Sequence, residues 1–146
     1  EAFSTDKYQY WPNAERYGFS MIRDFNRGTV GWTDWNLLLD QTGGPNHVSN
    51  FCFAPIHGDT STGELIYTPT YYYIGHFSKF VGPDSVRIST SVSRNVVLAT
   101  SFLNPDGTMA TIVMNKSDDP INYSFFLNDR QVDLTIPPRA MQTLVY

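Results

Sequence analysis

The sequence has one cysteine, Cys52, among its 146 residues. A single thiol can form no disulfide within the chain, and it excludes a zinc site built from several cysteines. The formal net charge is −4 at pH 7, so the chain lacks the basic field with which nucleic-acid-binding proteins attract phosphates. We therefore expect no nucleic-acid partner.

Long apolar runs and common cofactor motifs are also missing. No apolar stretch approaches the roughly 20 residues that a transmembrane helix needs, so we expect no transmembrane segment. There is no signal peptide, but the sequence starts at Glu1 rather than Met, which indicates a processed chain or a fragment. The sequence contains no phosphate-binding loop, no serine-hydrolase elbow and no zinc signature. We expect no cofactor.

Aromatic residues are abundant, with ten Phe and nine Tyr. The hydrophobic fraction of 41% is enough for a packed core and argues against disorder. Tyr and Trp combine a large apolar area with a polar tip, which suits protein interfaces and sugar-binding surfaces equally. Composition alone leaves these two uses open.

The first part of the chain, residues 1–82, has the pattern of α/β architecture. The stretch "PNAERYGFSMIRDFNRG" predicts a helix over 13–27 that stops at Gly28. "TVGWTDWNLLL" predicts a strand over 29–39, and its nearly continuous apolar content is typical of burial on both faces. A long loop follows to about Gly63. Thr68 then begins a second helix, "PTYYYIGHFSKF".

From residue 83 the pattern changes to short strands and turns. Six strands are expected, within 85–93, 96–104, 108–115, 121–128, 131–137 and 141–146. Pro105 fixes φ and Gly107 supplies a positive φ, so these residues predict a turn. A second turn is expected near 117–120. Strands at this spacing predict an antiparallel β-sandwich or barrel.

Polar residues near the predicted strand are the candidate site residues. Burying an unpaired carboxylate costs several kcal/mol or more, so Asp34 is either satisfied locally or belongs to a site at the strand's carboxyl end. Trp35 would lie on the opposite face, where an exposed indole would form a platform for a sugar. Asn46 and Asn50 follow the Gly-Gly-Pro turn and would either cap turns or bind hydroxyl groups.

Three other residues could suggest a metal site: His57, Asp59 and His76. Their spacing matches no standard ligand pattern, and His76 falls inside the second predicted helix. We therefore expect no metal.

Four stretches, in this order, carry a family resemblance: "GWTDWNLLLDQTGGPNHVSNF", "TGELIYTPTYYYIGHFSKF", "NPDGTMATIVMN" and "IPPRAMQTLVY". Together they resemble glycoside hydrolase family 30, the glucosylceramidase-like retaining β-glycosidases, over essentially the whole chain. The resemblance implies a (β/α)8 TIM barrel with an attached sandwich. Residues 1–82 would be the C-terminal part of the barrel, with its last strand and last two helices. Residues 83–146 would be the antiparallel β-sandwich.

The resemblance also implies a role for the first residue. "EAF" matches the family's nucleophile, a glutamate followed by a small residue, so Glu1 would be catalytic. Phe3 departs from the commoner cysteine, and Phe53 stands where the family usually has aspartate.

Four further residues are candidate substrate-binding residues by the same resemblance. Trp35 and Asn50 match residues that line the sugar pocket. Asp34 and Asn46 would bind hydroxyl groups or hold the loop.

The family's acid/base glutamate lies on the fourth barrel strand, and neither Glu15 nor Glu64 matches it. The resemblance implies a parent enzyme that cleaves a β-glycoside or glycolipid by double displacement. That enzyme would be secreted or periplasmic, or lysosomal in a eukaryotic host. This chain alone is expected to be inactive without the missing N-terminal barrel segment. The alternative is a non-catalytic β-sandwich module that binds carbohydrate or protein.

Overall fold

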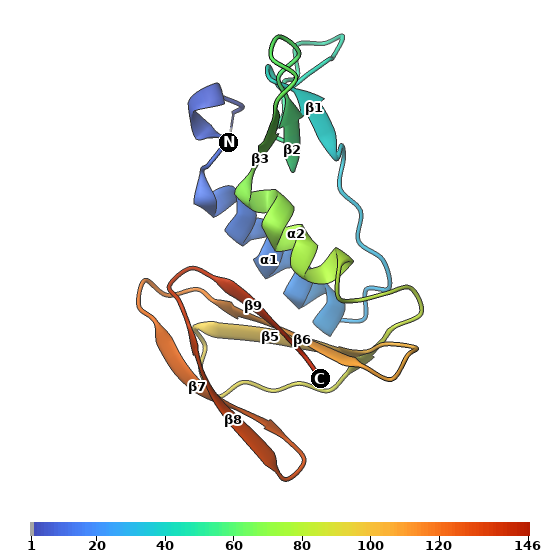
Figure 1. Ribbon diagram of the computed structural model, residues 1–146, viewed down its shortest axis with the longest axis vertical. Coiled ribbons are helices and arrows are strands. Elements are labelled where there is room, and N and C mark those ends of the chain that lie inside the picture. The colour runs from blue at the N-terminus through green and yellow to red at the C-terminus, as the bar shows by residue number, and fades with distance from the viewer. Residues whose placement is uncertain (1) are drawn as a thin grey trace.

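The computed structural model of the chain describes residues 2–146. Helices α1 (Trp11–Asn26) and α2 (Pro69–Ser78) lie side by side and run in the same direction across the middle of the molecule (Figure 1). A small sheet lies at one end of the helix pair, and the strands of the second half lie on the other side (Figure 1). Within the described part of the chain, no helix is long and apolar enough to cross a membrane.

The first expected helix is confirmed as α1. Its buried face consists of Asn13, Ala14, Gly18, Met21 and Ile22. Gly18 is required by packing, because a Cβ at this position would lie 2.7 Å from the Tyr73 ring and 2.8 Å from the Met141 sulfur. The glycine therefore lets α1 approach both α2 and the last strand closely.

The second expected helix is confirmed as α2, with Thr68 as its N-cap and Pro69 in its first turn. The Thr68 hydroxyl does not cap the helix. It lies 3.1 Å from the Ala54 carbonyl oxygen and 3.0 Å from that of Pro55, within donating distance of both. The start of α2 is thereby tied to the end of the loop that precedes β2.

The strand expected over 29–39 is wrong for most of its length. Residues 29–37 form no strand, and only β1 (Leu38–Asp40) is paired. The expected burial on both faces is also wrong, since Val30 is fully exposed and Leu37 is 66% exposed. A barrel strand needs hydrogen-bonded neighbours. Among residues 2–146 no strand pairs with residues 29–36, and the Leu37 carbonyl oxygen accepts one hydrogen bond, from the Ile56 N–H at 3.1 Å. Residues 29–37 run as irregular chain from α1 to β1 (Figure 1).

The loop expected from the Gly-Gly-Pro turn to about Gly63 is interrupted by a short strand. β2 (Ile56–Gly58) pairs in parallel with β1, and β3 (Leu65–Tyr67) pairs antiparallel with β2. Each strand has three residues, which is too short for a periodic pattern to be recognised in the sequence.

All six strands expected in the second half are confirmed. One sheet has the antiparallel order β4-β5-β6-β9, and a β7-β8 hairpin forms a second sheet. The turn at Pro105 is confirmed as well, and Gly107 has a φ of +87°. The strands are β4 (Val86–Ile88), β5 (Val97–Leu103), β6 (Met109–Asn115), β7 (Ile121–Leu127), β8 (Arg130–Ile136) and β9 (Met141–Val145).

The β5–β6 pair lies in the middle of a three-layer arrangement. Side chains alternate along a strand, so one face of the pair packs on the helices through Phe102, Ile112 and Met114. The other face packs on the β7-β8 hairpin through Val97 and Val113. Since the helices and the sheet share one core, the expected boundary between residues 82 and 83 stays a prediction.

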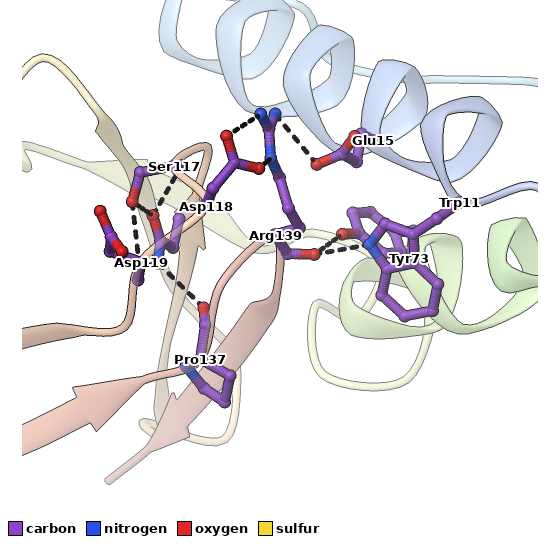
Figure 2. A network of polar contacts seen from close by, with 9 residues as sticks. Trp11, Glu15, Tyr73, Ser117, Asp118, Asp119, Pro137 and Arg139 are labelled. Atoms are coloured by element: carbon purple, nitrogen blue, oxygen red, sulfur yellow. Dashed lines mark hydrogen bonds and ion pairs between the residues drawn. The ribbon is translucent and has the colours of Figure 1, made fainter.

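Arg139, in the turn between β8 and β9, joins the sandwich to both helices (Figure 2). Its guanidinium pairs with Glu15 of α1 at 3.6 Å and with Asp118 at 2.9 Å. Its carbonyl oxygen accepts hydrogen bonds from the Trp11 indole at 2.6 Å and the Tyr73 hydroxyl at 2.7 Å. One residue thus contacts α1, α2 and the loop after β6, and fixes the sandwich against the helix layer.

Candidate active site

The Gly-Gly-Pro turn after β1 is built around the Asp40 carboxylate. This carboxylate accepts hydrogen bonds from the Thr42 hydroxyl at 2.6 Å, the Thr42 N–H at 2.8 Å and the Gly44 N–H at 2.9 Å. The bond from the Thr42 hydroxyl is the largest cause of a lowered pKa for Asp40. Gly43 has a φ of +81°, and a Cβ there would lie 2.6 Å from the Cys52 carbonyl oxygen. The expected turn is confirmed, and Gly43 has no room for a side chain.

His57 closes the loop that follows this turn. The side chain is fully buried, its Nε2 accepts a hydrogen bond from the Ala54 N–H at 3.0 Å, and its Nδ1 lies 2.8 Å from the Asp40 carbonyl oxygen. Because Nε2 is an acceptor, the proton of the neutral ring is on Nδ1. Burial lowers the pKa of His57 and favours this neutral form. The ring therefore ties together both ends of the loop over 41–53.

An aromatic cluster, made of Phe3, Tyr8, Phe53 and His57, joins the N-terminal segment to this loop. The centroid of the Phe3 ring lies 5.0 Å from that of Phe53, 5.4 Å from that of His57 and 6.0 Å from that of Tyr8. Tyr8 and His57 are 4.8 Å apart. The two residues that depart from the family pattern, Phe3 and Phe53, are thus in direct contact.

A cavity of about 540 Å³ lies beside the aromatic cluster. It is lined by Ala2, Phe3, Asn13, Arg16, Tyr17, Ser49, Asn50, Phe51, Cys52, Phe53, Ala54 and Thr70. Glu1, the expected nucleophile, lies outside the described residues. The structure does bring its neighbour Ala2 to the same cavity as Asn50.

Asn46 and Asn50 lie in the exposed part of the loop. The Asn46 side-chain oxygen accepts a hydrogen bond from the Asn50 N–H at 3.1 Å. Asn46 therefore holds the loop through this bond. This is one of the two roles that the sequence suggested for it, the other being the binding of hydroxyl groups. Asn50 lines the cavity.

Asp34 is held by α1 rather than by a neighbouring strand. It accepts a hydrogen bond from the Tyr17 hydroxyl at 3.1 Å. Burial, with the Asp34 charge as the next cause, raises the pKa of Tyr17 to about 12. The Tyr17 ring also packs edge to face on Trp32 at 5.6 Å, and the Trp32 indole donates to Asp24 at 3.3 Å. Asp34 is not among the residues that line the cavity, but it accepts a hydrogen bond from Tyr17, which does line the cavity.

Trp35 is 83% exposed and does not line the cavity. The regular strand expected to carry it is absent from the described residues. Its proposed contact with a sugar stays a prediction.

Sequence reasoning missed three polar residues of α1 that line the cavity, Asn13, Arg16 and Tyr17. The Arg16 guanidinium donates to the Asn13 side-chain oxygen at 2.9 Å. The i, i+3 spacing of this pair on a predicted helix was the available signal.

The three residues considered as metal ligands lie in different environments. His57 bonds backbone groups of its own loop, whereas the Nδ1 of His76 lies 2.8 Å from the Thr143 hydroxyl of β9. The Asp59 carboxylate accepts hydrogen bonds from the N–H and hydroxyl of Ser61. Residues 2–146 contain no group of three or more His, Cys, Asp or Glu side chains placed to hold a metal ion.

Comparison with known proteins identifies the family to which the chain belongs. The glycosyl hydrolase family 30 TIM-barrel domain matches residues 3–81, and the family's β-sandwich domain matches residues 84–144. The chain belongs to glycoside hydrolase family 30. It corresponds to the C-terminal end of the barrel followed by the sandwich.

Relatives with known names support this family 30 assignment. The lysosomal acid glucosylceramidase of Mus musculus is 38% identical over 112 residues, which cover 76% of this chain and 22% of the mouse protein. The crystal structure of SrfJ from Salmonella typhimurium is similar with a TM-score of 0.91 and 34% identity, over 100% of this chain and 32% of SrfJ. An endo-β1,6-glucanase is similar with a TM-score of 0.77 and 27% identity, over 88% of this chain and 30% of the glucanase. The chain spans between 22% and 28% of the length of the curated relatives it matches.

Proposed function

We propose that the longer protein containing this sequence is a retaining β-glycosidase of the glucosylceramidase type, with Glu1 as its nucleophile. The match of the family's TIM-barrel domain to residues 3–81 carries this proposal. It is supported by the 38% sequence identity to a mammalian glucosylceramidase. It is also supported by the cavity that both Ala2, the neighbour of Glu1, and Asn50 line. The substrate class is a β-glycoside, with β-glucosides of lipids as the first candidates.

The proposed reaction is a double displacement that needs two carboxyl groups about 5–5.5 Å apart. Glu1 attacks the anomeric carbon while an acid/base glutamate protonates the leaving oxygen. Water, deprotonated by that second residue, then hydrolyses the glycosyl ester on Glu1. The acid/base glutamate would come from the barrel segment that precedes this sequence, and the mechanism calls for no cofactor.

The substrate-binding roles follow from the environments of the side chains. Trp35 is 83% exposed in this chain, and in the longer protein its indole face would contact the C–H face of a sugar ring. Asn50 would contact hydroxyl groups from the cavity wall. Asn46 acts through Asn50, because its side-chain oxygen is used by the Asn50 N–H. Asp34 acts with Tyr17, which holds its carboxylate.

Replacement of the nucleophile tests this function. In the longer protein, Glu1→Ala should abolish hydrolysis of 2,4-dinitrophenyl β-glucoside, and added azide should restore release of dinitrophenol. Because azide would attack from the face that Glu1 vacates, the product should be the α-glucosyl azide. A Glu1→Ala variant that retains full activity would contradict the proposal.

A further inference from the structure

We propose that Phe3 is a positioning residue for catalysis: its ring, locked in the aromatic cluster, fixes the segment that carries Glu1 against the loop that carries Asn50. This inference rests on the proposed function, in which Glu1 attacks the sugar and Asn50 binds it. Phe3 also lines the cavity that carries Asn50, but its proposed role is to hold the segment that carries Glu1 and not to touch the reacting atoms.

The ring of Phe3 is held from several sides. Three rings surround it, at centroid distances of 5.0 Å for Phe53, 5.4 Å for His57 and 6.0 Å for Tyr8. The backbone of Gly43 approaches it as well, since a Cβ at Gly43 would lie 3.0 Å from Phe3 Cδ2. The ring is half-buried, and these contacts restrict how far it can shift.

The partners of Phe3 are themselves anchored to the loop. His57 is fully buried and bonds the backbone of Asp40 and Ala54, the residues that bracket the loop over 41–53. The Tyr8 hydroxyl donates to the Gln41 carbonyl oxygen. Phe3 is therefore tied to the loop that carries Asn50 from both ends.

The short distance along the chain makes this contact relevant to Glu1. Glu1 is two residues from Phe3, and two residues span at most about 7 Å of chain, so the inference is that loss of the Phe3 ring also displaces the nucleophile. A misplacement of about 1 Å at a reacting group can cost on the order of 100-fold in rate. A displacement of Glu1 would reduce kcat more than KM, because in the proposed function Glu1 attacks the sugar while other residues bind it.

The experiment compares three variants of the longer protein with 2,4-dinitrophenyl β-glucoside as substrate. Phe3→Leu removes the ring, and Phe3→Tyr keeps it. Phe125→Leu is the matched control, because Phe125 also packs against another ring, that of Tyr146 at 5.3 Å, but in the sandwich. For each variant, kcat, KM, the thermal midpoint and the rate of inactivation by 2,4-dinitrophenyl 2-deoxy-2-fluoro-β-glucoside are measured.

We expect Phe3→Leu to lower kcat by about 10- to 100-fold, with a much smaller change in KM and a parallel loss in the inactivation rate. Phe3→Tyr should retain most of the rate, and Phe125→Leu should leave kcat and KM nearly unchanged. The inference is overturned if folded Phe3→Leu keeps the wild-type kcat, or if Phe125→Leu loses the same rate at an equal loss of thermal midpoint. Full activity in Glu1→Ala, the variant that tests the proposed function, would instead overturn that function, and this inference with it.

Discussion

At the scale of single residues, two tryptophans three positions apart have opposite environments. Trp32 is half-buried, packs on Tyr17 and donates to Asp24, whereas Trp35 is 83% exposed. We expect Trp32→Ala to cost about 3 kcal/mol of stability, near the low end for a packed aromatic side chain. Trp35→Ala should cost much less stability and should lower kcat/KM instead. Denaturation midpoints and kinetics of both variants in the longer protein provide the check.

The opposite result for the pair would remove Trp35 from the site. If Trp35→Ala unfolds the protein while the remaining folded fraction keeps its kcat/KM, then Trp35 is a packing residue.

His57 should make stability depend on pH. Burial lowers its pKa below the ordinary value of 6.5 in the folded state, so the unfolded state binds more protons as the pH falls. The stability that neutral His57 contributes is complete above about pH 6.5 and is lost as the pH falls towards the folded-state pKa. We expect the urea midpoint to fall between pH 7.5 and 5, and His57→Gln to flatten this slope. The pKa of His76 is also lowered by burial, so part of the pH dependence should remain in His57→Gln. If His57→Gln leaves the slope of the urea midpoint against pH unchanged, His57 is not the group responsible.

The candidate site could be predicted only in part from its residues. The Gly-Gly-Pro turn is a local feature, and a positive φ at Gly43 follows from local chemistry. The contact between Phe3 and Phe53 joins residues far apart in the chain, and no periodicity or spacing reports such a contact. The bond from Asn50 to Asn46 was likewise not predictable in detail, because it depends on the path of an irregular loop.

At the scale of elements, two helix glycines make a matched pair. A Cβ at Gly18 would lie 2.7 Å from the Tyr73 ring, whereas a Cβ at Gly75 would meet nothing within 4 Å. We expect Gly18→Ala to destabilise the protein by about 1–3 kcal/mol through overpacking. Gly75→Ala should stabilise it by up to about 1 kcal/mol through helix propensity. If Gly18→Ala and Gly75→Ala change the denaturation midpoint equally, the close packing of α1 on α2 contributes little to stability.

The elements that the sequence predicts correctly are those defined by local patterns. Helix α1 has an apolar stripe, and α2 begins with a Thr-Pro signal. The sandwich strands are separated by turn residues. The strand over 29–37 was predicted wrongly because its apolar residues match a barrel strand, while among the described residues it has no paired neighbours. Its exposed Val30 and Leu37 are the side chains that a complete barrel would cover.

At the scale of the whole molecule, the chain by itself should hydrolyse no aryl β-glucoside above background. Loss of general acid catalysis typically costs about 10²- to 10⁴-fold, and a barrel represented by its C-terminal end also loses the positioning of the substrate. The measurement is an assay of the purified 146-residue chain with 4-nitrophenyl β-glucoside. Turnover that Glu1→Gln abolishes would contradict this expectation.

The identity of the nucleophile is tested most directly by trapping the glycosyl-enzyme intermediate. The longer protein is inactivated with 2,4-dinitrophenyl 2-deoxy-2-fluoro-β-glucoside and digested, and the labelled peptide is sequenced by mass spectrometry. We predict one equivalent of 2-deoxy-2-fluoroglucosyl attached to Glu1, in the peptide that contains the sequence Glu-Ala-Phe. A stoichiometric label on any other carboxylate, or turnover with inversion at the anomeric carbon and no label, would contradict the account.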